Sequence, residues 1–519
     1  FLEAGGIHRP EDTLHVAFTG LAHMLYLPLL AFGSSTAPAL LSLGFALLLP
    51  LAVFAFTTRL FGRESGRLSG IAVWGTATLA LVAVTARVDV TLALFLTVGH
   101  LCLYRALDGD GGRPWLLAAA ALLGMAMGVK YQGVAYVLAL SPLVLWAALR
   151  AGESDAFGRR ELGILAGVGV AAVAPWFLKN WVLLDAPFYP FLADRLLPPW
   201  LAEIYGARAV PDFVDPEVFG ALADVRRPFD LVAAFLHPER LSVEGEAAHY
   251  HLSPLLLLLP AVVFWPRDRR LVWLVAPAAG YLALVLSASS TTNLRYLVPA
   301  VPVLTIAASE ILARVTAFAE ARIAGDGPPV EGGPGGDEVS LDRGARVAAL
   351  VLAGATLLPT AAALGAWLPL EVSVPHLLGR QSRTEYLSER RNPSMVIRAG
   401  LTEFGEREPP DEARVLMLFD AREHYAPVPV LQDPLLTNWA LLRPTRPEGE
   451  CLEDTGVTHV LVNTAVLDYY LRRGLDPETV RWPSFRDFAA RCLTSTLDVP
   501  GFGFYRVTPG SAAPSSGPE

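Results

Sequence analysis

Residues 37–58 read APALLSLGFALLLPLAVFAFTT, an apolar run that contains no charged side chain. A membrane-spanning helix needs about 20 mostly apolar residues to cross roughly 30 Å of hydrocarbon, and this run is long enough. Nine further segments are comparable: 68–86, 90–106, 115–129, 132–150, 161–182, 252–266, 270–288, 296–314 and 345–369. The sequence therefore predicts an all-α polytopic membrane domain of about ten spans.

The composition agrees with a membrane protein. Of the 519 residues, 53% are hydrophobic and only 18% are charged, against about 25% charged residues in soluble globular chains. The formal net charge of −9 gives no basic footprint of the kind that nucleic-acid binding needs. The three cysteines are too few for a disulfide-rich scaffold or for a zinc site made of cysteine alone.

The arginines predict the orientation of the spans. Cytoplasmic loops collect Lys and Arg, and every second connection between the predicted spans is basic. These connections carry Arg59, Arg63, Arg67, Arg105, Arg113, Arg150, Arg159, Arg160, Arg267, Arg269, Arg270, Arg314, Arg322, Arg343 and Arg346. The alternation predicts that residues 1–36, the loop 183–251 and everything after 370 lie outside the cytoplasm.

Residues 15–33 form an eleventh apolar stretch, which contains His15, His23 and Pro28. If residues 1–14 are extracytoplasmic, both ends of this stretch face outward, so it lies in the membrane interface or re-enters. If it spans instead, the chain begins in the cytoplasm. The paired histidines and the internal proline favour an interfacial helix.

The chain is thereby divided into regions of different character. Residues 1–36 are an outer segment with the interfacial helix, 37–182 a transmembrane core, and 183–251 a long extracytoplasmic loop. Residues 252–369 hold the remaining spans and a Gly/Pro/acid-rich cytoplasmic linker at 325–343.

Residues 370–507 have a soluble composition. Short apolar runs at 414–419 and 458–463 predict strands, and 395–404, 464–473 and 484–493 predict helices. The sequence therefore predicts a small extracytoplasmic α/β domain, followed by a disordered tail at 508–519. Cys451 and Cys492 both fall in this domain, and the sequence leaves open whether they pair.

Asp89 is the first candidate functional residue. It opens a predicted span at its outer end, two residues after Arg87. A carboxylate at the membrane boundary is costly unless it is solvated or paired, so it is a functional hypothesis by default. The alternative is that Arg87 and Asp89 are an ordinary interfacial pair.

Three further cations are predicted at the same outer boundary: Lys130, Lys179 and Arg295. Lys130 and Lys179 are the only lysines of the chain. An ammonium group serves as a point charge for phosphate, so an anionic lipid headgroup would explain cations on this side. The alternatives are that Lys130 is an interface anchor and that the cations are unrelated snorkelling side chains.

Metal sites are weakly indicated. Two groups of residues contain histidines but lack a spacing typical of metal ligands: His8, His15 and His23 with Glu11 and Asp12, and the pair His249 and His251. The sequence also contains no phosphate-loop, dinucleotide-binding or G-x-S-x-G motif.

The candidate segments, taken in order, resemble the GT-C class of integral-membrane glycosyltransferases, in the branch of the protein O-mannosyltransferases and bacterial aminoarabinose transferases. The resemblance covers roughly residues 1–310. Its motifs are TARVDVTLALF at Thr85–Phe95, LGMAMGVKYQGV at Leu123–Val134, APWFLKNWVLLDAPFYPFL at Ala174–Leu192 and LRYLVPAVPV at Leu294–Val303. Each motif is loose, and the ordered set carries the resemblance.

The resemblance implies an inverting transfer of a sugar from a polyprenyl-phosphate donor on the outer face. It implies an aspartate in the first outer loop as the catalytic base, and that position is expected to precede Phe1. Asp89 matches the family's second acidic position, where it would position the acceptor, or a divalent cation if the reaction uses one. Lys130, Arg295 and also Lys179 and Arg87 would hold the donor phosphate.

The implied partners are a polyprenyl-phosphate-linked sugar, a lipid, glycan or protein acceptor, and the bilayer, without nucleic acid. The implied location is the cell envelope, in a bacterial inner (plasma) membrane. An anionic-lipid flippase or transporter without catalysis fits the outer cations equally well, although the sequence lacks the inverted repeat typical of secondary transporters. An inactive membrane scaffold would fit a chain without the first-loop aspartate.

Overall fold

The structure, a computed structural model, describes residues 20–32, 37–83, 87–108, 112–150, 157–188, 252–265, 268–288, 294–324 and shorter stretches between 347 and 508. The predicted loop 183–251, linker 325–343 and tail 508–519 lie almost entirely outside the described residues. The described chain divides into two compact units, a helical unit up to Trp367 and a sheet unit after it.

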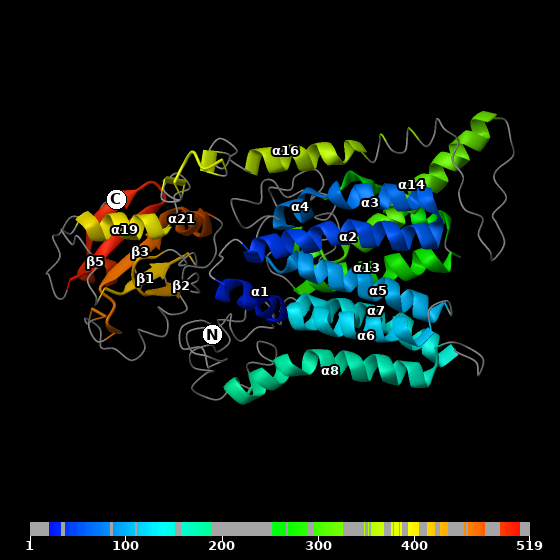
Figure 1. Ribbon diagram of the computed structural model, residues 1–519, viewed down its shortest axis with the longest axis horizontal. Coiled ribbons are helices and arrows are strands. Elements are labelled where there is room, and N and C mark those ends of the chain that lie inside the picture. Colours follow the sequence, from blue (N-terminus) through cyan, green and yellow to red (C-terminus); the bar gives the residue numbers. More distant parts are fainter. Residues whose placement is uncertain are drawn as a thin grey trace. The chain divides into compact units, whose positions relative to one another are not determined.

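The helical unit consists of helices with extensive apolar cores. Its elements are α1 (Leu21–Ala31), α2 (Ala37–Phe61), α3 (Arg63–Trp74), α4 (Ala77–Ala83), α5 (Asp89–Leu107), α6 (Gly112–Val129), α7 (Tyr131–Arg150), α8 (Arg159–Leu184), the 3₁₀ helix η5 (Pro254–Phe264), α13 (Arg269–Ala288), the short 3₁₀ helix η6 (Leu294–Leu297), α14 (Val301–Ala324) and α16 (Leu357–Trp367). The long helices lie side by side (Figure 1), and α5 is the most buried of the membrane-length helices.

Six of the described helices are long and apolar enough to cross a membrane: α2, α5, α6, α7, α8 and α14. They match the predicted spans that begin near 37, 90, 115, 132, 161 and 296. The protein is therefore an integral membrane protein. Helix α13 coincides with the predicted segment 270–288.

Other predicted spans differ from the structure. The segment at 68–86 is broken into α3 and α4, which meet at an angle of 62° and count as a seventh span only if taken together. A methyl group at Gly75, where α3 ends, would collide with the side chain of Thr356. Glycine at the break therefore allows Thr356 to pack closely against the backbone. The segment at 252–266 forms the 11-residue 3₁₀ helix η5, which is shorter than the span predicted there.

Helix α1 occupies the stretch whose place the sequence left open. It has 11 residues, about 16 Å at 1.5 Å per residue, which is shorter than the hydrocarbon core. Its location in the membrane interface stays a prediction.

The two ends of the helical unit differ in charge. Consecutive long helices run in opposite directions (Figure 1), so the residues between α6 and α7 lie at the same end as the start of α5. We call this the Asp89 end. The opposite end, which we call the arginine end, carries Arg63 at the start of α3, Arg150 at the end of α7 and Arg159 at the start of α8.

A network of ion pairs ties α3, α14 and the residues before α13 together at the arginine end. Glu310, 2% exposed, accepts hydrogen bonds from Ser65 Oγ and Arg314 Nε, both at 2.6 Å. Arg314 also donates to Asp268 at 2.5 Å. Asp268 accepts a further bond from Arg270, whose guanidinium also donates to the Leu60 carbonyl at 2.9 Å. From the sequence, these arginines were recognisable only as loop charges.

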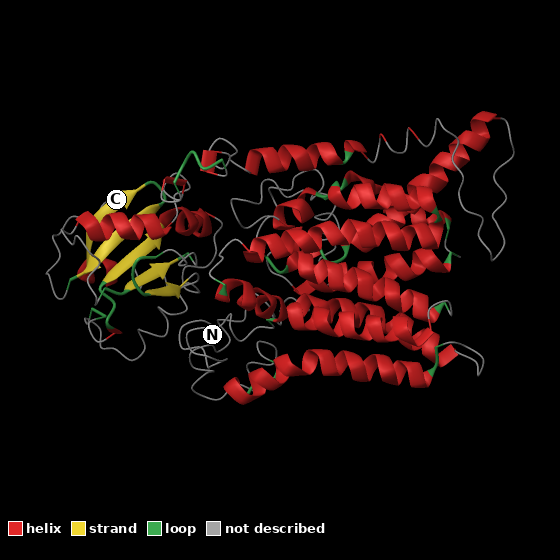
Figure 2. Ribbon diagram, in the orientation of Figure 1, coloured by secondary structure: helices red, strands yellow, loops and turns green. Residues whose placement is uncertain are grey.

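The sheet unit has the predicted α/β character (Figure 2). Its strands are β1 (Val415–Leu418), β2 (Val430–Asp433), β3 (His459–Asn463), β4 (Leu493–Val499) and β5 (Phe502–Val507), in the order β2-β1-β3-β5-β4. Strands β2, β1 and β3 are parallel, and β5 and β4 add to them in antiparallel fashion.

Alternating side chains of β1 bury both faces of this sheet. Val415 and Met417 belong to one apolar cluster with residues of α19 (Pro393–Glu403). Leu416 and Leu418 belong to the other cluster, which includes Leu467 of α21 (Thr464–Arg472). The helices therefore cover opposite faces of the sheet, as expected of strands that are apolar on both sides.

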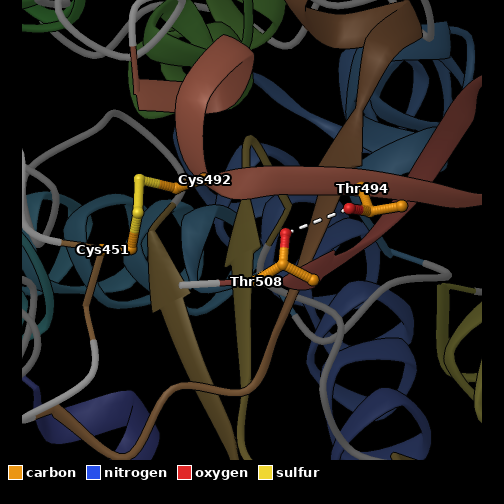
Figure 3. Close-up of a disulfide and its surroundings, with 4 residues drawn as sticks. All are labelled: Cys451, Cys492, Thr494 and Thr508. Carbon is orange, nitrogen blue, oxygen red and sulfur yellow. Dashed lines mark hydrogen bonds between the residues drawn. A yellow bond between two sulfur atoms is a disulfide. The ribbon is translucent and has the colours of Figure 1, made fainter. Parts of the chain in front are cut away.

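Cys451 and Cys492 form a disulfide in the sheet unit (Figure 3). Their Cα atoms are 5.4 Å apart across a sequence separation of 41 residues. Beside the bridge, the hydroxyls of Thr494 and Thr508 are hydrogen-bonded at 3.0 Å. The bridge joins the segment before β3 to the start of β4. The sequence left open whether these two cysteines pair, and in the structure they do.

Removal of the disulfide should destabilise the sheet unit. Closing a loop of this length stabilises a fold by about 2–4 kcal/mol, chiefly by restricting the unfolded chain. We expect Cys492→Ala to speed hydrogen exchange in β1 and β3, and thiol titration of the denatured, unreduced wild type to find one thiol, Cys102. Cys102→Ala is the matched control. Three titratable thiols in the wild type would contradict the pairing.

The stability of the sheet unit should depend on pH through the protonation of His459. Its ring is 3% exposed and stacks on Phe504 at 5.3 Å, and it lies opposite Arg506 in the β3–β5 pairing. Burial, with a smaller contribution from the Arg506 charge, lowers the pKa of His459 from 6.5 to about 4.

Between about pH 4 and 6.5 the unfolded chain therefore binds a proton at His459 that the folded unit does not. Stability should rise with pH across this window and fall as pH decreases through it. Hydrogen exchange of β3 measured from pH 4 to 7 should show this slope after correction for intrinsic rates. His459→Gln should flatten it, and an unchanged slope in that variant would assign the pH dependence to other groups.

Candidate functional site

Asp89 is buried at the first position of α5. It is 2% exposed, and its Oδ1 accepts a hydrogen bond from Lys130 Nζ at 2.9 Å. A carboxylate in the first turn interacts favourably with the helix dipole, but a buried charge also needs a partner of opposite sign. Lys130 provides that partner from 41 residues away. The structure thus joins two of the predicted site residues directly.

Lys130 is placed by the tight turn between α6 and α7. It is the single residue between the two helices, and a methyl group at Gly133 would collide with the backbone of Ala126. Glycine therefore allows α7 to fold back closely on α6. The ammonium group also lies 4.9 Å from the ring centroid of Tyr296, within the range of a cation–π interaction.

Arg295 and Tyr296 are held by η6. The hydroxyl of Tyr281, on α13, donates a hydrogen bond of 2.6 Å to the carbonyl of Tyr296, which fixes this short helix against the bundle. The guanidinium carbon of Arg295 lies 5.4 Å from the centroid of the Tyr296 ring. Tyr296 is thus in contact with both cations, Lys130 and Arg295.

Arg87 completes the group on the side of α2. The Ser42 hydroxyl, on α2, lies 3.4 Å from the Arg87 carbonyl in hydrogen-bonding geometry. The charges of Lys130, Arg295 and Arg87 all act on the Asp89 carboxylate. Three cations therefore lie near one carboxylate, and a group of cations of this kind is suited to binding an anion.

Lys179 lies on α8, where its ammonium group is 5.7 Å from the ring centroid of Trp176. The structure thus brings Lys130, Arg295 and Arg87 near Asp89, and the place of Lys179 in this group stays a prediction.

Several polar residues around Asp89 were missed by the sequence analysis. Ser42, Thr91, Tyr281 and Tyr296 belong to predicted spans or their ends, and Tyr26 belongs to the stretch 15–33. Each is a common residue in an apolar segment, and only the packing of α1, α2, α5 and α13 brings them to one place. The Arg-Tyr pair at 295–296 was quoted as a motif, but the tyrosine was given no role.

The donor set around Asp89 does not suit a divalent cation. The carboxylate is already paired with an ammonium group, and two guanidinium groups add to the positive charge. Within the described residues, no group of three His, Cys, Asp or Glu side chains could hold a metal. His8, His15, His249 and His251, and the acidic residues before α1, lie outside the described residues.

Part of the sequence matches a protein-family model. Residues 21–178 match the model of the dolichyl-phosphate-mannose-protein mannosyltransferases. This range includes α1, Asp89 and Lys130 and ends before Lys179. A comparison with curated proteins gives no match.

Two solved structures are similar to the chain at low sequence identity. One is the crystal structure of ArnT from Cupriavidus metallidurans bound to undecaprenyl phosphate, with a TM-score of 0.49 and 16% identity over 95% of this chain and 87% of that chain. The other is the archaeal oligosaccharyltransferase AglB from Archaeoglobus fulgidus with an inhibitory peptide and a dolichol-phosphate, with a TM-score of 0.45 and 13% identity over 95% and 66%. Over residues 21–178, the family match confirms the resemblance to the GT-C membrane glycosyltransferases that the sequence motifs indicated.

Proposed function

We propose that the protein is a membrane glycosyltransferase that transfers a sugar from a polyprenyl-phosphate donor to a hydroxyl-bearing acceptor. One observation carries the proposal: a buried carboxylate at one end of a helical membrane unit is paired with Lys130 and lies within electrostatic range of Arg295 and Arg87. The family match over residues 21–178 supports it, because the family is described as dolichyl-phosphate-mannose-protein mannosyltransferases. The sugar and the acceptor, whether lipid, glycan or protein, are not specified by these residues.

Lys130, Arg295 and Arg87 hold the donor phosphate in this proposal. When the bond between the sugar C1 and the phosphate oxygen breaks, negative charge grows on the departing polyprenyl phosphate. Cations placed in advance around that oxygen stabilise the transition state more than the ground state. Tyr296 supports this function because its ring contacts two of the cations, and Tyr281 acts indirectly by fixing η6.

Asp89 orients the groups that react. Its carboxylate already accepts a hydrogen bond from the Lys130 ammonium and can accept others, so it is suited to orienting donor groups. We therefore assign Asp89 to holding the acceptor hydroxyl and the Lys130 ammonium in position. The proton of that hydroxyl goes to the first-loop carboxylate that the resemblance implies. Attack on C1 from the face opposite the phosphate inverts the anomeric configuration.

The proposed site faces away from the cytoplasm. The basic connections of the chain lie at the arginine end, and cytoplasmic loops carry the excess of Lys and Arg. The Asp89 end is therefore the outer end, where a lipid-linked donor presents its sugar. By the same argument the sheet unit is extracytoplasmic, and the disulfide is compatible with an oxidising compartment.

Asp89→Asn should greatly reduce transfer while the protein still folds. The amide has nearly the shape of the carboxylate but lacks the charge that orients Lys130. We expect at least about a 100-fold loss, as found when reacting groups are mispositioned by about 1 Å. The assay is release of polyprenyl phosphate from a sugar-linked donor in vesicles supplied with a membrane extract as the source of acceptors.

The same assay separates transfer from lipid movement. A flippase would move the intact donor lipid between leaflets without breaking its sugar–phosphate bond. If the wild type moves the lipid and releases no polyprenyl phosphate, the glycosyltransferase proposal is wrong. A wild-type rate in a well-folded Asp89→Asn protein would remove Asp89 from the site.

Lys130→Ala should weaken binding of the donor phosphate. A charge-assisted hydrogen bond contributes about 1.5–3 kcal/mol, so we expect roughly a 10- to 100-fold higher Kd for dolichyl phosphate. Arg150→Ala is the matched control, because Arg150 ends the same helix that Lys130 precedes and lies at the arginine end, against Trp146. Equal affinity of the two variants would make Lys130 an anchor.

Loss of Lys130 also leaves Asp89 buried without its partner, which by itself destabilises a fold. The double variant Asp89→Asn/Lys130→Gln removes both charges and separates the two effects. If weak lipid binding arises only from misfolding, the double variant should recover both stability and affinity. If Lys130 binds phosphate, stability recovers and affinity does not.

A further inference from the structure

Two hydroxyl groups that are buried beside Asp89 lie next to each other without forming a hydrogen bond of normal geometry. Tyr26, on α1, is 5% exposed and Thr91, on α5, is fully buried. Neither Tyr26 Oη nor Thr91 Oγ1 makes a hydrogen bond of normal geometry within the described residues. Buried polar groups are nearly always hydrogen-bonded in folded proteins, because an unsatisfied one costs stability. A ligand that supplies the missing bonds would remove that cost.

The position of these hydroxyls distinguishes them from others in the bundle. Thr91 and Ser42 lie beside the Tyr26 hydroxyl, and Tyr26 is within electrostatic range of the Asp89 carboxylate. Thr91 follows Asp89 by two residues in the same helical turn. Thr57 and Thr97 also have buried hydroxyls without partners, so burial alone does not indicate a ligand-binding site. Tyr26 and Thr91, in contrast, bring two such groups together near the Asp89 carboxylate.

The chemistry of these groups matches a sugar. A hydroxyl group both donates and accepts hydrogen bonds, and so do the hydroxyls of a pyranose or furanose ring. In a polyprenyl-phosphate sugar the ring is joined to the phosphate through one oxygen atom. Groups that adjoin the cations around the phosphate therefore adjoin the sugar as well.

We propose that Tyr26 and Thr91 form a hydroxyl-binding subsite for the sugar of the donor, between α1 and the start of α5. This inference rests on the proposed function and adds to it a specificity-determining pair of residues. It also assigns a function to α1: the helix brings one polar group, Tyr26, to a site otherwise formed by longer helices.

The test compares lipids with and without a sugar. The full chain in detergent is titrated with dolichyl phosphate and with its mannose, glucose, galactose and arabinose conjugates, and the rise in Tm gives the apparent Kd. The variants are Tyr26→Phe and Thr91→Val, which remove only the hydroxyls in question. Thr97→Val is the matched control, because it removes an equally buried hydroxyl from the same helix, further from Asp89.

We expect all four proteins to bind dolichyl phosphate equally. One conjugate should bind the wild type and Thr97→Val more tightly than the bare lipid does. For Tyr26→Phe and Thr91→Val that advantage should fall by about five- to tenfold, the usual effect of one hydrogen bond. Without lipid, the two variants should melt at or above the wild-type temperature, since each loses a buried hydroxyl that makes no hydrogen bond of normal geometry.

Other outcomes would contradict either the subsite or the proposed function. If the variants keep the full advantage of the sugar, or if no conjugate binds the wild type better than dolichyl phosphate, the subsite is not there. A lower Tm of Tyr26→Phe without lipid would make the hydroxyl structural. If dolichyl phosphate does not bind the wild type at all, the proposed function itself fails, independently of Tyr26 and Thr91.

Discussion

The ion pair between Asp89 and Lys130 is the interaction on which the Asp89 end depends. Neither charge is stable at this depth alone, so the start of α5 and the α6–α7 turn must meet. A second link joins the same part of the bundle further along α5. His100 Nε2 lies 3.0 Å from the Trp273 carbonyl, and Nδ1 lies 2.8 Å from the Tyr136 hydroxyl. Because a carbonyl can only accept, Nε2 carries the proton and Tyr136 donates to Nδ1. Helices α5, α7 and α13 are thereby held in one arrangement, and α13 in turn fixes η6 through Tyr281.

The two ends of the helical unit use charge in opposite ways. At the arginine end, Glu310 and Asp268 face Arg314 and Arg270, so two carboxylates balance two guanidinium groups. The positive and negative charges of this network balance, and the network holds α3 and α14 to the segment before α13. At the Asp89 end, one carboxylate lies near three cations. Charged residues are costly at a membrane boundary and often mark functional sites, and this group is suited to an anionic ligand.

Much of this arrangement follows from local sequence, and the rest depends on pairing over long distances. Apolar runs locate α2, α5, α6, α7 and α8, and alternation of apolar residues locates β1 and β3, because both signals are confined to neighbouring residues. Asp89 and Lys130 are recognisable singly, since a charge at a span boundary is rare. Their contact, the bond from Ser65 to Glu310 across 245 residues, and the Cys451–Cys492 bridge are set by tertiary packing alone. Tyr26 and Thr91 carry no signal in the sequence, because a hydroxyl in an apolar segment gains meaning only from its neighbours.

The location of the charges bears on the choice between transfer and transport. A transporter binds its cargo near the bilayer midplane, so that the site can open alternately to either side. Within the described part of the helical unit, the ion pairs lie at the two ends, and the polar link at His100, midway along α5, consists of neutral groups bonded to one another. A lipid phosphate held at the Asp89 end is reached from one side only, and moving it to the other would require passage along α5, the most buried of the membrane-length helices. A fixed one-sided site is a disadvantage for a flippase. For a transferase it is an advantage, because the same cations that bind the donor remain in place as the phosphate departs.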